Sequence, residues 1–383
     1  MNNNSIIFFH PSSELYGSDK ILVYVMKTFS DYKKTLILCE EGPLIELVKN
    51  ECTDVMIHIL PTLPIIRKKN FKPNGIIKFI FTLVVFRKDI NRLIKEKPSI
   101  IYLNTLATLP VLFYYRNIMK IIHVHEILKN NSLLHKTINR VAIRKSDALI
   151  CVSNAVRDNL IEVANTEISG KIKVVYNGIN FKKEEMDDNN ILLNTDNRIL
   201  NFALIGRIKP SHKGQCLLLD AIAKLSSEHL SQCHFYFVGS PVPGQEYMQD
   251  EVITKIHTLN LGTKVTIIPF IKKIEQIYEQ TDVVIVPSTF DDPFPTTVLE
   301  AMFFNKPVIG TRVGGIPEMI IDAETGFLVN RDDVSDLSMK IAYFIDNRDI
   351  IQEMGEKGRI FFEKNFSEES FVYRYKDTIN DIL

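Results

Sequence analysis

Short runs of consecutive apolar residues alternate along the chain with longer segments in which apolar residues recur every three or four positions. The short runs are typical of strands buried on both faces of a parallel sheet, and the longer segments are typical of amphipathic helices. The alternation therefore predicts an α/β fold. We predict strands at residues 6–9, 35–39, 55–60, 100–103, 121–126, 147–152, 173–176, 200–205, 234–238, 265–268, 283–286 and 308–310.

The alternation is interrupted once, by a polar, charged and asparagine-rich segment at residues 180–198 that is typical of a linker. A chain of 383 residues is long enough for two domains of about 200 residues each. We therefore predict domains at residues 1–180 and 181–365, each Rossmann-like, with a ligand cleft between the facing strand ends. Residues 366–383 have apolar positions at helical spacing, so we expect them to pack against one of the domains.

Charge is divided unevenly between the halves although the net charge is zero. Residues 1–183 contain 27 Lys and Arg against 15 Asp and Glu, whereas the remainder contains 19 against 31. A basic half suggests an anionic partner, which could be nucleic acid, a lipid surface or a phosphorylated substrate. No basic motif interleaved with aromatic residues is present, so nucleic acid is disfavoured.

The five cysteines form no C-x-x-C pair, so the sequence predicts neither a disulfide framework nor a zinc ribbon. A reducing, cytoplasmic location is expected. The first apolar run, at residues 6–9, is too short for a signal peptide and has no basic flank.

An apolar stretch at residues 76–86 lies among basic residues. A helix of this length is too short to cross a bilayer. It could lie on an anionic membrane surface, or it could be a core helix with a basic solvent face, and the sequence leaves both readings open. The basic neighbours are Arg67, Lys68, Lys69, Lys72, Arg87, Lys88, Arg92, Lys95 and Lys97.

Residues 282–318 have the pattern of a strand, an acidic loop, a helix, a second strand and a turn opened by two glycines. In parallel sheets, ligands bind beyond the carboxyl ends of the strands, where Asp292 and Glu300 are expected to lie. Arg207 and Lys213 follow an earlier strand in the same way. Two cations beside a helix start could hold a diphosphate, although a lone pair of basic residues is more often solvated surface.

In the first half, Gly17 and Ser18 follow the first strand, where an anion-binding loop or an ordinary turn would both fit. His123 and His125 would share one face of a strand. A metal pair is disfavoured because no H-E-x-x-H motif follows. His125 and Glu126, at the carboxyl end of this strand, are better interpreted as ligand-contacting groups.

Several motifs together resemble the retaining glycosyltransferases of the GT-B architecture, of the group 1, family four type found in bacterial polysaccharide assembly. They are HPSSELYGSD at 10–19, HVHE at 123–126, VSNAV at 152–156, VYNGI at 175–179, GRI and KGQ within 206–215, FDDPFPTTVLEAM at 290–302 and KPVIGTRVGGIPE at 306–318. The chain departs from the family pattern at three places. Asp292 replaces the first glutamate of the E-x7-E motif, Tyr16-Gly17-Ser18 replaces paired glycines, and one extra residue separates Arg207 from Lys213.

The resemblance implies transfer of a hexose from a nucleotide diphosphate sugar, with retention, to a saccharide that could be linked to polyprenyl diphosphate. It implies a peripheral position on the inner face of the membrane, a C-terminal helix that crosses back to the first domain, and no required metal or other cofactor. No D-x-D motif stands at the expected place, because Asp291 and Asp292 belong to the acidic loop. A non-catalytic relative acting as a binding or assembly subunit is the main alternative. A Rossmann dehydrogenase is disfavoured because no G-x-G-x-x-G follows the first strand.

The resemblance also implies roles for individual residues. Arg207 and Lys213 would stabilise the departing diphosphate, Asp292 would bind hydroxyls of the donor sugar, and Glu300 would bind the ribose. His125 would lie by the donor sugar and completes the expected catalytic set. The expected substrate-binding residues are Gly17, Ser18, Glu126, Gly239, Phe270, Ile271, Pro293, Phe294, Pro295, Thr296 and Thr297, with Phe270 and Ile271 meeting the base.

Overall fold

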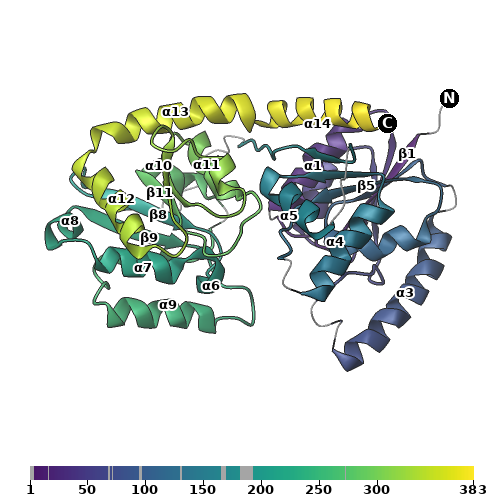
Figure 1. Cartoon of the computed structure of the whole chain (residues 1–383), viewed down its shortest axis with the longest axis horizontal. Helices are drawn as coiled ribbons and strands as arrows, with labels where there is room; N and C mark the ends of the chain where they lie inside the picture. The colour runs from purple at the N-terminus through teal and green to yellow at the C-terminus, as the bar shows by residue number, and fades with distance from the viewer. Residues whose placement is uncertain are drawn as a thin grey trace. The chain divides into compact units, whose positions relative to one another are not determined.

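The computed structural model describes residues 4–15, 17–67, 70, 72–94, 97–129, 132–164, 170–181, 193–271 and 273–383. The chain divides into two compact units, which are residues 1–178 with 368–383 and residues 179–367. Figure 1 shows the elements of both units. Most of the predicted linker, and the predicted basic residues Lys68, Lys69 and Lys95, lie outside the described residues.

The first unit is built on a seven-stranded parallel sheet with the strand order β3-β2-β1-β4-β5-β6-β7. Its strands are β1 (Ser5–His10), β2 (Lys33–Leu38), β3 (Val55–Ile59), β4 (Ile100–Leu103), β5 (Met119–Val124), β6 (Ala148–Cys151) and β7 (Ile172–Val174). Its helices are α1 (Gly17–Thr28), α2 (Pro43–Glu51), α3 (Pro73–Leu93), the 3-10 helix η2 (Leu106–Tyr114), α4 (Leu133–Lys145), α5 (Asn154–Ala164) and α14 (Glu368–Ile382). The predicted strands are confirmed, except that two end early: β5 ends at Val124, which leaves His125 and Glu126 in the following loop, and β7 ends at Val174.

The second unit is built on a six-stranded parallel sheet with the strand order β10-β9-β8-β11-β12-β13. Its strands are β8 (Leu200–Ile205), β9 (Cys233–Val238), β10 (Val265–Ile268), β11 (Val283–Val286), β12 (Val308–Thr311) and β13 (Gly326–Val329). Its helices are α6 (Pro210–Lys213), α7 (Gln215–Ala223), α8 (Ser227–Ser231), α9 (Tyr247–Thr258), α10 (Glu275–Gln280), α11 (Thr296–Phe303), the 3-10 helix η3 (Ile316–Glu318), α12 (Val334–Asp346) and α13 (Asp349–Asn365). Strand β13 and helices α6, α8, α9, α10, α12 and α13 were not predicted.

The strand order reverses once in each sheet, between β1 and β4 in the first unit and between β8 and β11 in the second. At such a switch point the connections leave the two central strands in opposite directions, which opens a crevice at their carboxyl ends. We therefore expect ligands to bind at the loops that follow these four strands.

The C-terminal helix α14 belongs to the first unit, as the resemblance implied. Its apolar side chains Phe371, Tyr375 and Ile379 are part of the same buried core as β1 and β4. The hydroxyl of Tyr375 lies 2.5 Å from that of Tyr102 on β4. The helical spacing of its apolar residues thus reflects burial against the first sheet.

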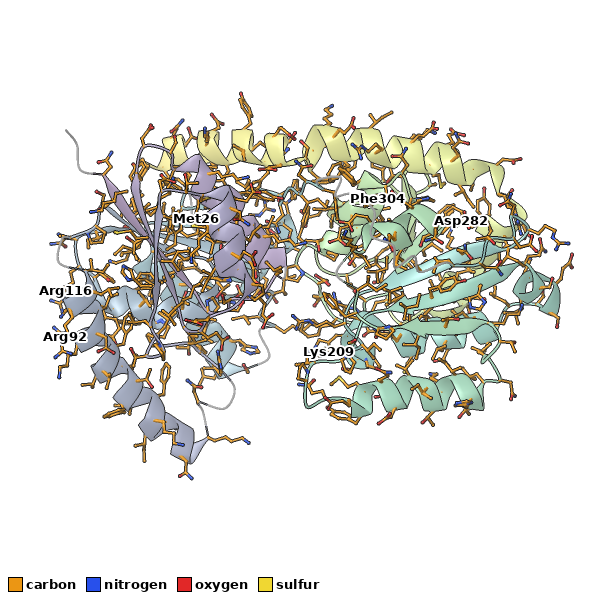
Figure 2. The ribbon with its side chains drawn as sticks, turned by 180° about the vertical axis from the view of Figure 1, so that it is seen from behind. Met26, Arg92, Arg116, Lys209, Asp282 and Phe304 are labelled. Atoms are coloured by element: carbon orange, nitrogen blue, oxygen red, sulfur yellow. The ribbon has the colours of Figure 1, made fainter. Side chains whose placement is uncertain are left out.

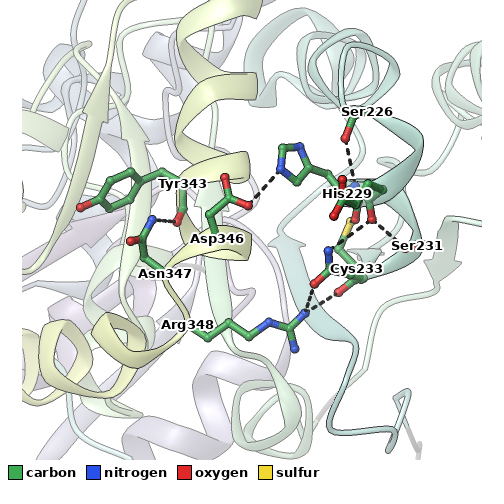
Figure 3. Close-up of polar contacts among 10 residues, drawn as sticks. Ser226, His229, Ser231, Cys233, Tyr343, Asp346, Asn347 and Arg348 are labelled. Carbon is green, nitrogen blue, oxygen red and sulfur yellow. Dashed lines mark hydrogen bonds and ion pairs between the residues drawn. The ribbon is translucent and has the colours of Figure 1, made fainter.

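A set of polar contacts joins the end of α12 to the segment between α8 and β9 in the second unit (Figure 3). The ring of His229 lies 3.1 Å from the carboxylate of Asp346, the last residue of α12. The guanidinium of Arg348 donates to the backbone oxygen of Gln232 at 3.4 Å and to its side-chain oxygen at 3.3 Å. These contacts hold the corner at which the chain turns from α12 into α13.

Helix α3 is apolar on two faces. Phe86 and Ile90 are buried in the first unit, whereas Ile77 is 72% exposed and Phe81 is 70% exposed. Figure 2 labels Arg92 near the end of α3 that lies against the rest of the unit, and the other end of the helix projects away. The apolar stretch 76–86 is thus the middle of a longer helix.

Among the described residues, no helix is long and apolar enough to cross a membrane.

We expect Phe371→Ala to lower the free energy of unfolding of the first unit by about 3–5 kcal/mol, because it leaves a cavity in a close-packed core. The matched control is Tyr373→Ala on the same helix, because Tyr373 is 75% exposed. Urea unfolding followed by circular dichroism measures both variants. Equal loss of stability in the two variants would contradict the packing of α14 on this core.

Candidate active site

A corner between two helices of the second unit carries Lys213. Helix α6 ends at Lys213 after four residues, and Gly214 joins it to α7 with a φ of 74°. Residues other than glycine rarely adopt this φ value, and a Cβ atom at Gly214 would also lie 1.9 Å from the backbone oxygen of Pro287. The corner is therefore packed against the end of β11. The sequence predicted a loop here, because a helix of one turn has no periodic pattern.

Lys213 makes an ion pair with Asp292, and the Nζ atom lies 2.6 Å from Oδ2. The Lys213 side chain is 34% exposed and that of Asp292 is 18% exposed, so the pair is accessible to a ligand. The structure therefore brings together two of the predicted catalytic residues. It also shows that the predicted diphosphate cation and the predicted sugar-binding carboxylate are bonded to each other.

The two glycines predicted to open a turn hold the backbone of the acidic loop. Gly314 has a φ of 53°, and a Cβ atom there would lie 2.0 Å from the backbone oxygen of Asp292. The amide of Gly315 donates to the same oxygen at 2.9 Å. The position of the Asp292 carboxylate is thus set by close backbone packing as well as by Lys213.

The neighbouring carboxylate Asp291 has a different partner. It makes an ion pair with Arg331, which follows β13. One carboxylate of the pair thus contacts Arg331 and the other contacts Lys213. Within the described ranges, no group of three or more His, Cys, Asp or Glu side chains could hold a metal ion. Sequence reasoning missed Arg331, which no motif marks.

Arg207 follows β8 and has an exposed side chain. Its backbone oxygen accepts a hydrogen bond of 2.9 Å from the side chain of Gln215, which is fully buried. Gly239, after the adjacent strand β9, packs on the same turn, since a Cβ atom there would lie 2.1 Å from the oxygen of Gly206. The backbone around Arg207 is thus held from two sides while its guanidinium reaches solvent.

Helix α11 begins at Thr296 beyond the acidic loop and carries Glu300. The hydroxyl of Thr297 donates to the backbone oxygen of Ile205, at the end of β8, over 3.4 Å. The first turn of α11 therefore lies at the switch point of the sheet. The backbone amides and the partial positive charge at the start of a helix favour an anion there.

Tyr278 of α10 donates a hydrogen bond of 2.7 Å to Oε2 of Glu300. Tyr278 is fully buried, and burial together with the Glu300 charge raises the pKa of its hydroxyl well above the usual value. The hydroxyl therefore remains a donor at all working pH values. Tyr278 was not predicted from the sequence, because no motif marks its position in a short helix.

The remaining predicted substrate-binding residues of the second unit differ in exposure. Phe294 and Pro295 are buried, and Phe294 packs edge-on against Phe366. Phe270 is 74% exposed, and its amide donates to the hydroxyl of Ser240 at 3.0 Å. Pro293, Thr296, Thr297 and Ile271 are partly buried.

In the first unit, a buried polar network joins the ends of β1 and β4. His10 contacts Asp19 through Nε2, and both side chains are almost completely buried. The amide nitrogen of Asn104 donates to Nδ1 of His10 at 3.1 Å and to the backbone oxygen of Ser18 at 3.0 Å. Gly17, predicted to lie in a loop, is the first residue of α1. The network was not predicted, and only its place at the ends of two central strands could have indicated it.

His125 and Glu126 lie at the carboxyl end of β5. The ring of His125 lies 4.1 Å from that of His123, and its buried Nε2 atom has no hydrogen-bond partner in the described structure. Burial, with a smaller effect of nearby His10, lowers the pKa of His125 to about 3. Burial raises the pKa of Glu126 to about 7, although its carboxylate accepts hydrogen bonds of 3.1 Å from the amides of Leu106 and His125. At neutral pH, His125 is therefore an uncharged imidazole.

Two parallel-sheet units with charged switch points are the architecture of GT-B glycosyltransferases, and comparison with known families supports this class. Residues 48–183 match the model of Glycosyltransferase Family 4, and residues 183–361 match that of Glycosyl transferases group 1. The two matches together span residues 48–361. The chain belongs to the glycosyltransferases and is an enzyme of this class.

Among curated relatives, an uncharacterized glycosyltransferase of Methanocaldococcus jannaschii is 29% identical over 341 residues, which are 85% of this chain and 84% of that protein. The trehalose synthase of Thermococcus litoralis is 38% identical over 27% of this chain and 24% of its own. The N-acetyl-alpha-D-glucosaminyl L-malate synthase of Bacillus anthracis is 24% identical over 64% of this chain and 62% of its own.

Solved structures share the fold. HepE of Anabaena, in complex with UDP and glucose, has a TM-score of 0.76 at 20% identity, covering 98% of this chain and 99% of its own. Sucrose-phosphate synthase of Thermosynechococcus elongatus has a TM-score of 0.78 at 18% identity, covering 99% of each chain. The predicted GT-B fold is confirmed.

The low pKa of His125 predicts a loss of stability in acid. Between the folded pKa of about 3 and the ordinary value, the unfolded chain binds a proton that the folded chain does not. Lowering the pH from 7 to 5 should therefore reduce the contribution of His125 to the free energy of unfolding by about 2 kcal/mol, whereas the raised pKa of Glu126 acts in the opposite direction. Urea unfolding at both pH values should show that acidification is less destabilising in His125→Gln than in the parent.

The exposed His257 provides the control for loss of one histidine, and His257→Gln should retain the reduction seen in the parent. If His125→Gln loses as much stability between pH 7 and 5 as the parent, His125 is not held neutral.

Proposed function

We propose that the chain transfers a hexose from a nucleotide diphosphate sugar to a saccharide acceptor with retention at the anomeric carbon. The observation that carries the proposal is the contact of Lys213 with Asp292 beside the first turn of α11. A cation, a carboxylate and the start of a helix within one switch point provide groups for both a diphosphate and sugar hydroxyls. The Anabaena neighbour described in complex with UDP-glucose supports a nucleotide sugar as donor.

The chemistry required of this site is stabilisation of a leaving group. The bond from the anomeric carbon to the diphosphate breaks, a bond to the acceptor oxygen forms, and the acceptor proton passes to the departing diphosphate. Arg207, Lys213 and the first amides of α11 would stabilise the negative charge that develops on the diphosphate, which is electrostatic catalysis. This role needs no metal ion, and we propose that none is required.

Asp292 and Glu300 are assigned to hydroxyl groups. Asp292 stands where the family has the first glutamate of E-x7-E, and its shorter side chain is already engaged with Lys213. The nucleotide sugar would therefore bind with its diphosphate on Lys213 and its sugar hydroxyls on Asp292. Lys213 would then keep a negatively charged partner, and Asp292 would keep hydrogen-bond donors. Glu300 would accept hydrogen bonds from ribose hydroxyls, and exposed Phe270 offers a ring to the base. In the first unit, we assign neutral His125 to a sugar hydroxyl.

The proposed acceptor is a saccharide linked to polyprenyl diphosphate, at an anionic membrane surface, in cell-surface polysaccharide assembly. Helix α3 supports a membrane surface as partner, because exposed apolar side chains follow one stripe of it and the basic residues Lys78, Arg87 and Lys88 beside them are also exposed. An apolar face with a basic rim is the pattern by which helices bind anionic lipid. The stripe consists of Ile76, Ile77, Ile80, Phe81 and Val84.

Lys213→Met should weaken binding of the donor about 10–100-fold, because a hydrogen bond to a charged group contributes about 1.5–3 kcal/mol. A panel of nucleotide sugars is screened for a rise in the melting temperature, since a ligand that binds the folded state stabilises it. The sugar that stabilises the parent is then used in a transfer assay, in which EDTA should not reduce the rate.

The matched control is Lys224→Met, because Lys224 donates to Ser335 at the surface of the same unit. It should bind the donor like the parent. If no nucleotide sugar stabilises the parent and none is hydrolysed or transferred, the chain is a non-catalytic relative and the proposal is wrong.

Replacing Ile77, Phe81 and Val84 together by Ser should reduce co-sedimentation with vesicles that contain anionic phospholipid, because it removes the apolar stripe of α3. The control replaces Met339 and Ile360, which are exposed apolar residues of the second unit, by Ser. Charge reversal at Lys72 and Lys78 should have the same effect as loss of the stripe. Sedimentation that none of these changes alters would exclude α3 as the membrane contact.

A further inference from the structure

Tyr278 contacts Glu300 of α11 and Phe304, the residue that follows the end of this helix. Its hydroxyl donates to Glu300 at 2.7 Å, and its ring stacks on that of Phe304 with a centroid distance of 5.3 Å and an interplanar angle of 3°. Residues four apart lie on one face of a helix, so a single side chain from α10 can reach both. Figure 2 labels Phe304 within this region.

The stack on Phe304 fixes the Tyr278 ring, because Phe304 is itself held in an aromatic cluster. Its ring lies 5.1 Å from that of Phe303 and 5.2 Å from that of Phe181. Tyr278 is fully buried, so no water competes for its hydroxyl. The hydroxyl is thus held at one place, and the Glu300 carboxylate is oriented by it.

Only one of the two oxygen atoms of the Glu300 carboxylate takes part in this contact. Tyr278 binds Oε2, and within the described chain no hydrogen bond to Oε1 is recorded. Glu300 is partly exposed at the carboxyl side of the sheet. A carboxylate with one oxygen bound by a rigid donor can present its remaining lone pairs in a fixed direction, which is what recognition of two neighbouring hydroxyls requires.

We propose that Tyr278 is a positioning residue that orients Glu300 for the two ribose hydroxyls of the donor nucleotide. This inference rests on the proposed function, because it takes the ligand of Glu300 to be a ribose. Tyr278 itself touches no substrate. Its effect is therefore selective for nucleotides that carry both hydroxyls, whereas a residue that only stabilises the fold would affect all nucleotides alike.

The test measures binding by isothermal titration calorimetry. UDP, GDP, ADP and CDP are titrated into the parent, and the tightest of them is paired with its 2′,3′-dideoxy analogue. Tyr278→Phe retains the ring and its stack on Phe304 but removes the hydroxyl. It should weaken binding of the ribonucleotide about 10-fold, within the range expected for a hydrogen bond to a charged group, and should change binding of the dideoxy analogue less than 2-fold.

Two further variants complete the design. Tyr236→Phe removes a buried hydroxyl that accepts a hydrogen bond of 2.8 Å from the amide of Asn194, and it should bind both nucleotides like the parent. Glu300→Gln should lose discrimination between the two nucleotides in the same way as Tyr278→Phe. In the transfer assay, Tyr278→Phe should raise the KM for the donor and leave kcat within 2-fold of the parent.

The outcomes separate the inference from the function on which it rests. If the parent prefers the ribonucleotide and Tyr278→Phe weakens both nucleotides equally or neither, the positioning role is overturned while the proposed function stands. If the parent binds none of the four nucleotides, or binds a ribonucleotide and its dideoxy analogue equally, the ribose role of Glu300 is overturned and the inference falls with it.

Discussion

Close backbone packing around the loop after β11 is the constraint on which the candidate site depends. The loop lies between two glycines, Gly214 and Gly314, at each of which a Cβ atom would overlap a backbone oxygen of the loop. Protein interiors do not relax easily around such an overlap, because they are packed as densely as organic crystals. The packing places Asp292 against Lys213 and sets the point at which α11 begins. The charged groups of the second unit thus take their positions from backbone geometry.

The two units present different chemistry at their switch points. In the second unit, cations, helix amides and carboxylates lie together and remain open to solvent, which suits an ionic ligand with hydroxyl groups. In the first unit, the polar groups at the ends of β1 and β4 are buried and bonded to one another, and burial keeps His125 uncharged. A buried polar network of this kind costs free energy unless its members are paired, so it fixes one arrangement of the chain. The polar groups at this end of the first unit are therefore buried and fixed, whereas those of the second unit are charged and accessible.

Helix α3 has features of both a core helix and a helix that lies on an anionic surface. Its apolar content is typical of a core helix, and Phe86 and Ile90 do lie in the core. Its basic content is typical of a helix on an anionic surface, and the stripe that includes Ile77 and Phe81 is exposed. The sequence could not separate these readings, because a period of 3.6 residues shows which positions share a face but not which face meets the protein.

The sequence by itself determined the class of fold and the positions of nearly all strands, because strands buried on both faces appear as continuous apolar runs. Motif resemblance also indicated Lys213, Asp292 and Glu300, which lie in the segments that follow β8 and β11. Only the tertiary structure decided what these residues contact: Lys213 binds Asp292, and Glu300 is held by Tyr278. It likewise decided the network of His10, Asp19 and Asn104. Such contacts join residues far apart along the chain, and their geometry depends on the strand order and on backbone packing, which local patterns of hydrophobicity do not encode.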